Sequence, residues 1–296
     1  MIVVNLKGGL GNQMFQYAAG AALAASHGVP LLLDLHSLQR NTQETNQFTP
    51  RNAELDIFNL KIEEASQELL QKFQSVTSTL HYRIRRNISE SLIRYRIFQH
   101  DELNYPELFS RLGGYTYLNG FFQSEKFFNS QQTYIRKLFT WRDPLNSANE
   151  AAAGKIAMCE AVSVHVRRGD YIKPANAALF GNICTAEYYQ CALEKIKREV
   201  SNPVFFIFSD DMQWVRSNLN TGAETHYIDF NTGHNSHLDM RLMSLCRHHI
   251  IANSSFSWWG AWLNANTNKK VIAPKVWIHQ SDAHIDDILP AEWIKM

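Results

Sequence analysis

Two adjacent arginines, Arg167 and Arg168, carry the most distinctive chemistry in this sequence. They follow the run 162–166, in which valines alternate with other residues as in a buried strand, and Gly169 allows a sharp turn after them. Guanidinium groups bind phosphate through paired hydrogen bonds, and open α/β sheets place ligands at strand ends. His165 is expected on the same side of the strand as Arg167. The segment predicts an anion site, although an arginine pair alone is also typical of a solvated loop.

A second polar segment stands between a later predicted strand and helix. It consists of Asn253, Ser254 and Ser255, and Phe256 follows them. Hydroxyls and free backbone N–H groups at a helix N-terminus form an anion site without a metal, but either serine would serve equally as an N-cap. Asp239 opens the helix before this segment.

The N-terminal glycine-rich loop lies between a predicted strand and a predicted helix. Gly9 and Gly11 fit the first glycines of a dinucleotide-binding fingerprint, and Asp34 lies near the distance of a ribose-binding acid. Met14 occupies the place of the third glycine, which argues against a nicotinamide site. Asn12 is expected to cap the helix, to contact a ligand, or to do both.

The elements that would position these residues alternate between strand and helix. Residues 2–6, 13–27 and 30–34 predict a βαβ unit, and 143–147 predicts a linker. The later strands are expected near 161–166, 204–209, 225–230, 249–252 and 270–273, with helices near 186–199, 212–219, 236–246 and 257–264. The pattern predicts an α/β fold of two Rossmann-like domains with parallel sheets facing a cleft, over 1–146 and 147–296.

Residues 36–113 have a weaker pattern. A helix is expected over 63–77, and Ser124 is expected to cap a helix that runs to about Phe139. Arginines alternate with apolar residues over 82–98, which predicts an amphipathic helix with either a solvated basic face or a weak docking surface for anionic membranes.

Composition excludes several classes of protein. The 296 residues have a net charge of +1, so no broad basic face for nucleic acid is expected. No apolar run reaches the length of a membrane span, and the first residues do not resemble a signal peptide. Four scattered cysteines fit free thiols in a reducing cytoplasm. We expect a cytoplasmic protein with at most peripheral membrane contact.

Four segments together resemble known fucosyltransferase signatures. The segment 165–171 resembles the first signature of the superfamily that binds GDP-fucose at an arginine-rich site. Residues 209–211 resemble the second signature, and 239–255 the third. The N-terminal string 8–18 closely resembles bacterial α-1,2-fucosyltransferases of glycosyltransferase family 11.

This resemblance implies a GT-B-like α/β fold and an inverting transfer of L-fucose from GDP-L-fucose to O2 of a terminal β-galactose, in glycan or O-antigen synthesis. It implies catalytic roles for Arg167, Arg168 and Asp170, and acceptor contacts for Asn12 and Gln13. Within the donor site, His165 and Asp239 would contact guanine or ribose. The implied GDP-fucose site comprises Gly11, His165, Arg167, Asp211, Asp239, Asn253, Ser254, Ser255 and Phe256.

The resemblance leaves the general base open and implies no metal. In the α-1,6 branch a glutamate soon follows the first signature, whereas 172–176 contains no acid. An acid beside two arginines would be a weak base, so we expect Asp170 to orient Arg168. No Asp-x-Asp triplet occurs. Asp210 and Asp211 are therefore expected to cap a helix and pair with an arginine, with no metal cofactor.

Three alternative functions differ in what they would bind. A fucosyltransferase of another linkage would share GDP. A non-catalytic glycan-binding protein on the same scaffold would not need His165, Arg167 and Asp239 together. A nicotinamide oxidoreductase is opposed by Met14.

Overall fold

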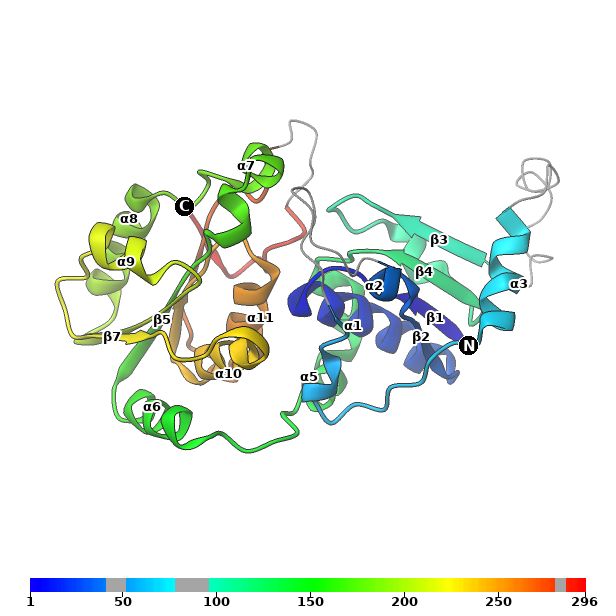
Figure 1. Cartoon of the computed structure of the whole chain (residues 1–296), viewed down its shortest axis with the longest axis horizontal. Coiled ribbons are helices and arrows are strands. Elements are labelled where there is room, and N and C mark those ends of the chain that lie inside the picture. Colours follow the sequence, from blue (N-terminus) through cyan, green and yellow to red (C-terminus); the bar gives the residue numbers. More distant parts are fainter. Residues whose placement is uncertain (41–51, 78–95, 280–285) are drawn as a thin grey trace. The chain divides into compact units, whose positions relative to one another are not determined.

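The computed structural model describes residues 1–40, 52–77, 96–279 and 286–296 of the chain. The chain divides into two compact units (Figure 1). The first contains the described residues up to Arg142 together with Asp286–Ile288. The second contains the described part of Asp143–Ile285 together with Leu289–Met296.

The first unit is built on four parallel strands in the order β2-β1-β4-β3. The strands are β1 Ile2–Asn5, β2 Leu31–Asp34, β3 Arg96–His100 and β4 Thr116–Gly120. The helices are α1 Leu10–His27, α2 His36–Arg40, α3 Gln67–Thr77 and α5 Gln132–Leu138. Successive residues of β1 face opposite sides of the sheet. Val3 packs with α3, whereas Val4 lies so close to α1 that a Cβ on Gly20 would be 2.3 Å from its Cγ2.

The second unit is built on six parallel strands in the order β10-β9-β8-β5-β6-β7. The strands are β5 Glu160–Val166, β6 Pro203–Ser209, β7 Thr225–Ile228, β8 His248–Ile250, β9 Val271–Ala273 and β10 Ile294–Lys295. The helices are α6 Ser147–Ala157, α7 Pro174–Phe180, α8 Ala186–Glu199, α9 Met212–Asn218, α10 His237–Leu245 and α11 Ser255–Leu263. Figure 1 shows α8 and α9 on one side of this sheet and α10 and α11 on the other.

The two faces of β5 have different neighbours. The valines 162, 164 and 166 pack against α8 and α9 with apolar residues of β6, β8 and β9. On the alternate positions, the His165 ring meets Phe256 of α11 at 5.6 Å between ring centroids. The period of two in this strand therefore separates an apolar face from the face that carries the first predicted site residue.

The predicted α/β alternation is confirmed through the second unit, where all five expected strands and all four expected helices occur. Thr185 caps α8 as expected, by accepting a hydrogen bond from the Tyr188 N–H. The short β10 was not expected from the sequence. Within the described residues, no helix is both long enough and apolar enough to cross a lipid bilayer.

Three local predictions were wrong in the first unit. Helix α1 begins at Leu10, with Gly9 as its N-cap, so Asn12 lies in the first turn and does not cap it. Ser124 caps a short 3₁₀ turn, and α5 begins only at Gln132. Arg96 and the residues after it form β3 rather than the end of a helix, and the rest of the expected 82–98 helix lies outside the described residues.

Three tryptophans of α11 pack against one another. Trp258 is fully buried and stacks on Trp262 at 6.0 Å, while its ring meets Trp259 edge-on at 5.0 Å. The interpretation of these residues as core is confirmed.

We expect Trp258→Ala to lower the free energy of unfolding by about 3–5 kcal/mol, because it deletes a fully buried ring and leaves a cavity. Denaturant unfolding followed by circular dichroism measures this change, and Trp258→Phe should give a smaller loss. Met158→Ala is the matched control, since Met158 is 87% exposed and should change little. Equal effects at Trp258 and Met158 would contradict the assignment of α11 to the core.

Candidate functional site

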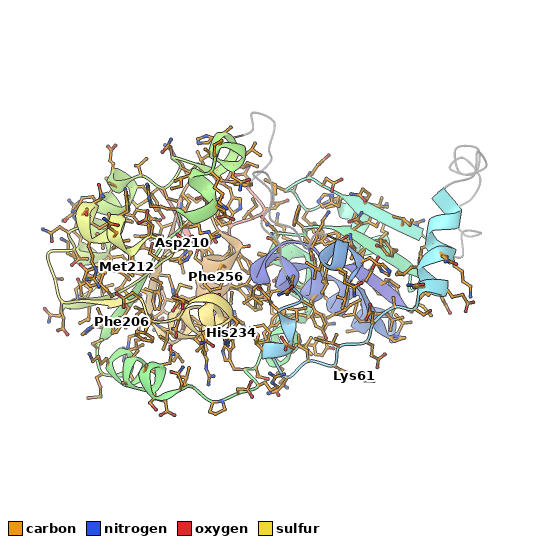
Figure 2. All side chains as sticks on the ribbon, viewed as in Figure 1. Lys61, Phe206, Asp210, Met212, His234 and Phe256 are labelled. Atoms are coloured by element: carbon orange, nitrogen blue, oxygen red, sulfur yellow. The ribbon has the colours of Figure 1, made fainter. Side chains whose placement is uncertain are left out.

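The carboxyl ends of four neighbouring parallel strands meet at one edge of the second sheet, in the order β8, β5, β6, β7. Adjacent strands lie about 4.8 Å apart. Residues 165–170 end β5, 209–211 end β6, Asp239 follows β7, and 253–256 follow β8. Open α/β sheets bind ligands at this edge. The topology therefore brings the predicted residues of the second unit to one edge. Figure 2 labels Asp210 and Phe256, which stand at the end of β6 and in the first turn of α11.

Arg167 lies between two carboxylates. Its Nη2 is 2.6 Å from Asp170 Oδ1, and its Nη1 is 2.7 Å from Asp210 Oδ2. Burial alone would lower the pKa of Arg167, but the charges of Asp210 and Asp170 outweigh it and raise the pKa, so the group stays protonated. A guanidinium has more N–H donors than these contacts occupy, and donors remain for an anion.

Arg168 is fixed by three contacts. Its backbone N–H donates to Asp210 Oδ1 at 2.9 Å, and its Nε donates to Asp211 Oδ2 at 3.1 Å. Its guanidinium lies 4.3 Å from the centroid of the Trp214 ring. Asp211 also caps α9 by accepting from the Trp214 N–H at 3.0 Å.

These contacts settle two predictions about the acids. Asp211 caps α9, and Asp210 and Asp211 each pair with an arginine, as expected. The expectation that Asp170 orients Arg168 was wrong, because Asp170 pairs with Arg167 instead. Asp170 stands three residues after Arg167 in a 3₁₀ turn that begins at Gly169. This spacing returns its carboxylate to the first arginine.

Gly169 is required for the approach of Asp210. A Cβ added to Gly169 would lie 2.5 Å from Asp210 Oδ2 and 3.0 Å from its Cγ. Any side chain here would push away the carboxylate that holds Arg167. The sequence interpretation invoked a sharp turn, whereas the structure shows that space is the tighter constraint.

His165 is neutral and has one ring nitrogen unused. Burial lowers its pKa to about 4, and Arg167 adds to this effect while Asp210 opposes it. Its Nδ1 is buried and has no hydrogen-bond partner within the described part of the chain. Buried polar atoms without a partner are rare in native structures, so this nitrogen indicates a ligand contact.

The polar residues at the start of α11 differ in whether the fold already uses their side chains. The Asn253 amide is consumed by the fold, because it donates to the carbonyls of Phe180 and Trp277. The N-cap residue Ser254 makes no capping hydrogen bond through its side chain. The first-turn N–H groups, beginning at the partly exposed Ser255, therefore lack a side-chain cap and present the positive end of the helix.

Asp239 lies in the first turn of α10 and is partly exposed. Burial raises its pKa to about 7, although a hydrogen bond from Asn231 opposes the rise. Its Oδ1 accepts from Asn231 Nδ2 at 2.8 Å. The carboxylate is thus oriented by a residue that the sequence did not single out.

The predicted residues of the first unit lie in the first turn of α1. Gly11 is buried, and Asn12 Oδ1 accepts from Gln123 Nε2 at 2.7 Å. Gln13 is fully buried, and both N–H groups of its amide donate to the carbonyls of Gly8 and Asn52. Gln13 therefore holds this loop together, and its amide has no N–H left to donate to an acceptor sugar.

Sequence reasoning missed three residues that shape the site. Trp214 lies under the Arg168 guanidinium, and Asn231 orients Asp239. Tyr171 donates to the Asn253 carbonyl at 2.9 Å, and its ring lies 5.7 Å from the Arg167 guanidinium. A tryptophan three residues after the expected cap Asp211 was a usable signal. No sequence signal indicated the contact between residues 231 and 239.

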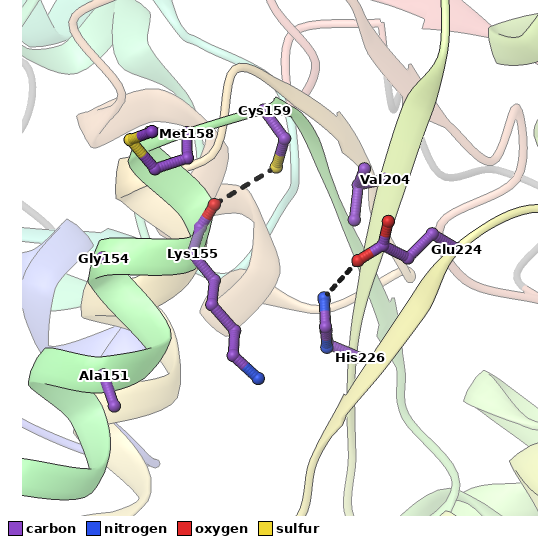
Figure 3. Close-up of a pocket in the computed structure, with 8 residues that line it drawn as sticks. All are labelled: Ala151, Gly154, Lys155, Met158, Cys159, Val204, Glu224 and His226. Carbon is purple, nitrogen blue, oxygen red and sulfur yellow. Dashed lines mark hydrogen bonds and ion pairs between the residues drawn. The ribbon is translucent and has the colours of Figure 1, made fainter.

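An open depression of about 720 Å³ lies elsewhere in the second unit (Figure 3). It is lined by α6 residues together with Cys159, Val204, Glu224 and His226. Val204 and His226 lie near the amino ends of β6 and β7, the opposite edge from the predicted residues. The polar groups Glu224 and His226 bond to each other at 3.0 Å. The carboxyl-end cluster is the stronger candidate because its residues present unused polar groups.

Comparison with known proteins decides the family. The model of Glycosyl transferase family 11 matches residues 1–296. The chain belongs to glycosyltransferase family 11. The resemblance stated from the sequence is confirmed.

Several relatives cover most or half of this family 11 chain. An alpha-1,2-colitosyltransferase of Escherichia coli is 33% identical over 309 aligned positions, covering 100% of this chain and 99% of the relative. The Escherichia coli O-antigen biosynthesis glycosyltransferase WbnK is 32% identical, and the alignment covers 92% of this chain and 93% of WbnK. Galactoside alpha-(1,2)-fucosyltransferase 1 of Homo sapiens is 27% identical over 49% of this chain and 42% of its own.

The structure of Arabidopsis thaliana FUT1, solved as a variant with GDP, superposes with a TM-score of 0.54 at 12% identity. The superposition covers 91% of this chain and 69% of the Arabidopsis thaliana chain. The predicted GT-B-like α/β fold with two parallel sheets is confirmed.

We expect Arg167→Ala to reduce glycosyl transfer by at least about a hundredfold, since losing one preorganised donor at a developing charge costs about 3 kcal/mol. Arg167→Lys should also be poor, because an ammonium cannot reproduce the paired contacts. Initial rates and thermal midpoints should be measured together. Arg216→Ala is the control, since Arg216 pairs with Asp229 at 3.0 Å on the surface of the same unit. Near-normal turnover in both Arg167 variants would remove this residue from the active site.

We expect Gly169→Ala to slow transfer by a smaller factor than Arg167→Ala, because the added methyl displaces Asp210 and leaves Arg167 present but misplaced. Gly154→Ala is the control, because nothing lies within 4 Å of a Cβ at that position. It should leave the rate unchanged and raise helix stability by about 0.5–1 kcal/mol. Identical rates for the two variants would show that the approach of Asp210 to Gly169 is not needed.

Proposed function

We propose that this chain transfers L-fucose from GDP-L-fucose to O2 of a terminal β-galactose, with inversion at the anomeric carbon. The observation that carries the proposal is the cluster at the carboxyl ends of β5, β6 and β8. There a doubly held arginine, a neutral histidine with an unused nitrogen and an uncapped helix start converge. The match over the whole chain to family 11 supports the reaction class.

In this proposal Arg167 and the start of α11 hold the diphosphate. When the bond between fucose and GDP breaks, negative charge collects on the β-phosphate oxygens. Fixed donors stabilise such charge without the reorganisation that water would need. We therefore propose that no divalent metal is required. Asp170 and Asp210 would keep the Arg167 guanidinium in place before the nucleotide binds.

Asp239 would select the base of the nucleotide. A carboxylate can accept hydrogen bonds from both N–H groups on the edge of guanine, and adenine offers no such pair. The complex of Arabidopsis thaliana FUT1 with GDP supports a guanine nucleotide in this fold.

The donor sugar has one competing candidate. The Escherichia coli relative is named for colitose, and the human relative for fucose transfer to galactoside. Colitose is fucose without the 3-hydroxyl, so both donors would share the diphosphate and base contacts described above. The acceptor contact proposed for Asn12 does not distinguish them.

The test supplies GDP-fucose or GDP-colitose with a panel of β-galactosides and determines the linkage of each product by NMR. We expect an α-1,2-fucosyl galactoside, and inhibition by GDP far stronger than by ADP or UDP. If a product forms only from GDP-colitose, the proposed donor sugar is wrong and the proposed nucleotide site stands. A fucose linked to another position would change the acceptor. Equal inhibition by all three nucleotides, or glycan binding without transfer, would contradict the proposal.

A further inference from the structure

Three asparagine side chains form a continuous chain of hydrogen bonds that ends on Asp239. Asn146 Oδ1, at the N-cap of α6, accepts from the backbone N–H of Asn149 at 3.1 Å and from its Nδ2 at 2.9 Å. Asn149 and Asn231 exchange two hydrogen bonds through their amides, at 2.9 and 2.8 Å. Asn231 Nδ2 then donates to Asp239 Oδ1 at 2.8 Å.

The chemistry of the groups gives this chain one direction. An ionised carboxylate only accepts hydrogen bonds, so one N–H of the Asn231 amide must point toward Asp239. The other N–H and the carbonyl of Asn231 then pair with the Asn149 amide. Asn149 uses both N–H groups of its amide, one on Asn231 and one on Asn146. Asn149 is 0% exposed and Asn231 is 9% exposed. A rotated amide would leave buried donors unsatisfied, which is costly.

We propose that Asn231, held in place by Asn149, positions the Asp239 carboxylate for the guanine base of the donor. This inference rests on the proposed function, in which Asp239 reads the nucleotide. The hydrogen bond from Asn231 occupies one lone pair of Oδ1 and fixes the plane of the carboxylate. The second lone pair of Oδ1 and the whole of Oδ2 are then presented to the ligand. Asn231 and Asn149 are positioning residues, since neither needs to touch the nucleotide.

The same contact controls the charge of Asp239. Burial raises its pKa to about 7, and the hydrogen bond from Asn231 is the interaction that lowers it. Within the described residues, no charged group contributes to this balance. The helix α11 packed on α10 contains no titratable side chain. The titratable groups on the other elements packed around Asp239 are His234, His237, Arg241, Glu150 and Lys155. Loss of Asn231 should therefore raise the pKa of Asp239 further.

The first measurement is calorimetric binding of GDP, with ADP as comparison, between pH 5.5 and 9, a range that extends to both sides of the Asp239 pKa of about 7. The wild-type protein should prefer GDP. Its GDP affinity should fall as the pH decreases through the pKa of Asp239, because a protonated carboxyl cannot accept from both guanine N–H groups. No acceptor sugar and no turnover are involved in this readout.

The decisive variant is Asn231→Ala. We expect GDP affinity at neutral pH to fall about tenfold or more, the range of a lost hydrogen bond to a charged group. The acid limb of the binding profile should move to higher pH. In transfer assays, the KM for the donor should rise more than kcat falls. The double variant Asn231→Ala with Asp239→Asn should bind GDP no worse than Asp239→Asn alone, because both substitutions act through one carboxylate.

Two further variants separate positioning from folding. Asn149→Ala keeps the Asn231 side chain but removes the amide that holds it, so the pH profile should shift in the same direction by less. This variant also tests the proposal if Asn231→Ala does not fold. Asn264→Ala is the matched control. Asn264 is 5% exposed, follows the last residue of α11, and donates to the Cys246 carbonyl at 2.7 Å. It should lose stability and keep the GDP affinity and pH profile of the wild type.

The outcomes distinguish the two proposals. A wild-type protein that binds ADP as well as GDP would overturn the proposed function. A wild-type protein that prefers GDP, with an Asn231→Ala variant that keeps both affinity and pH profile, would overturn only the positioning role. Additive losses in the double variant would likewise assign Asn231 to the fold and not to Asp239.

Discussion

The ion pairs that hold Arg167 are the constraint on which the rest of this site depends. One guanidinium meets Asp170 from its own loop and Asp210 from the neighbouring strand end. All three side chains are about one quarter exposed. A partly buried ion pair adds little net stability. Removing one partner, however, leaves the other charge desolvated and without a compensating interaction. The arrangement therefore fixes a cation at the strand edge, and it explains why Gly169 must leave room for Asp210.

The loops around this cation are braced by three tyrosine hydroxyls. Tyr189 donates to the His165 carbonyl at 3.0 Å, Tyr171 to that of Asn253 at 2.9 Å, and Tyr188 to that of Ile251 at 2.7 Å. Burial raises the pKa of all three hydroxyls, so they remain donors throughout the physiological range. The ends of β5 and β8 are thus fastened to the helices and the turn beside them. A site built on such braced elements keeps its geometry before the ligand arrives.

The sequence was sufficient for what depends on neighbours along the chain. Periodicity predicted the strands and helices of the second unit, and the capping roles of Thr185 and Asp211 followed from local chemistry. It failed where tertiary contacts decide. Asp170 pairs with Arg167 because a 3₁₀ turn returns it there. Gln13 became a structural brace because Asn52, 39 residues away, accepts from its amide. No local pattern contains either fact.

The same distinction separates two parts of the proposed donor site. The arginines, their acids and the serines that begin α11 are encoded in short contiguous segments, so the proposed diphosphate site could be predicted from the sequence. The orientation of Asp239 depends on Asn149 and Asn231, which lie 82 positions apart and meet only in the fold. Choice between sugars that differ by a hydroxyl requires a polar group that the poorer donor leaves unpaired. The position of such a polar group is also set by contacts between residues that are distant in the sequence. Family membership therefore predicts the phosphate chemistry of this chain more firmly than the sugar that it transfers.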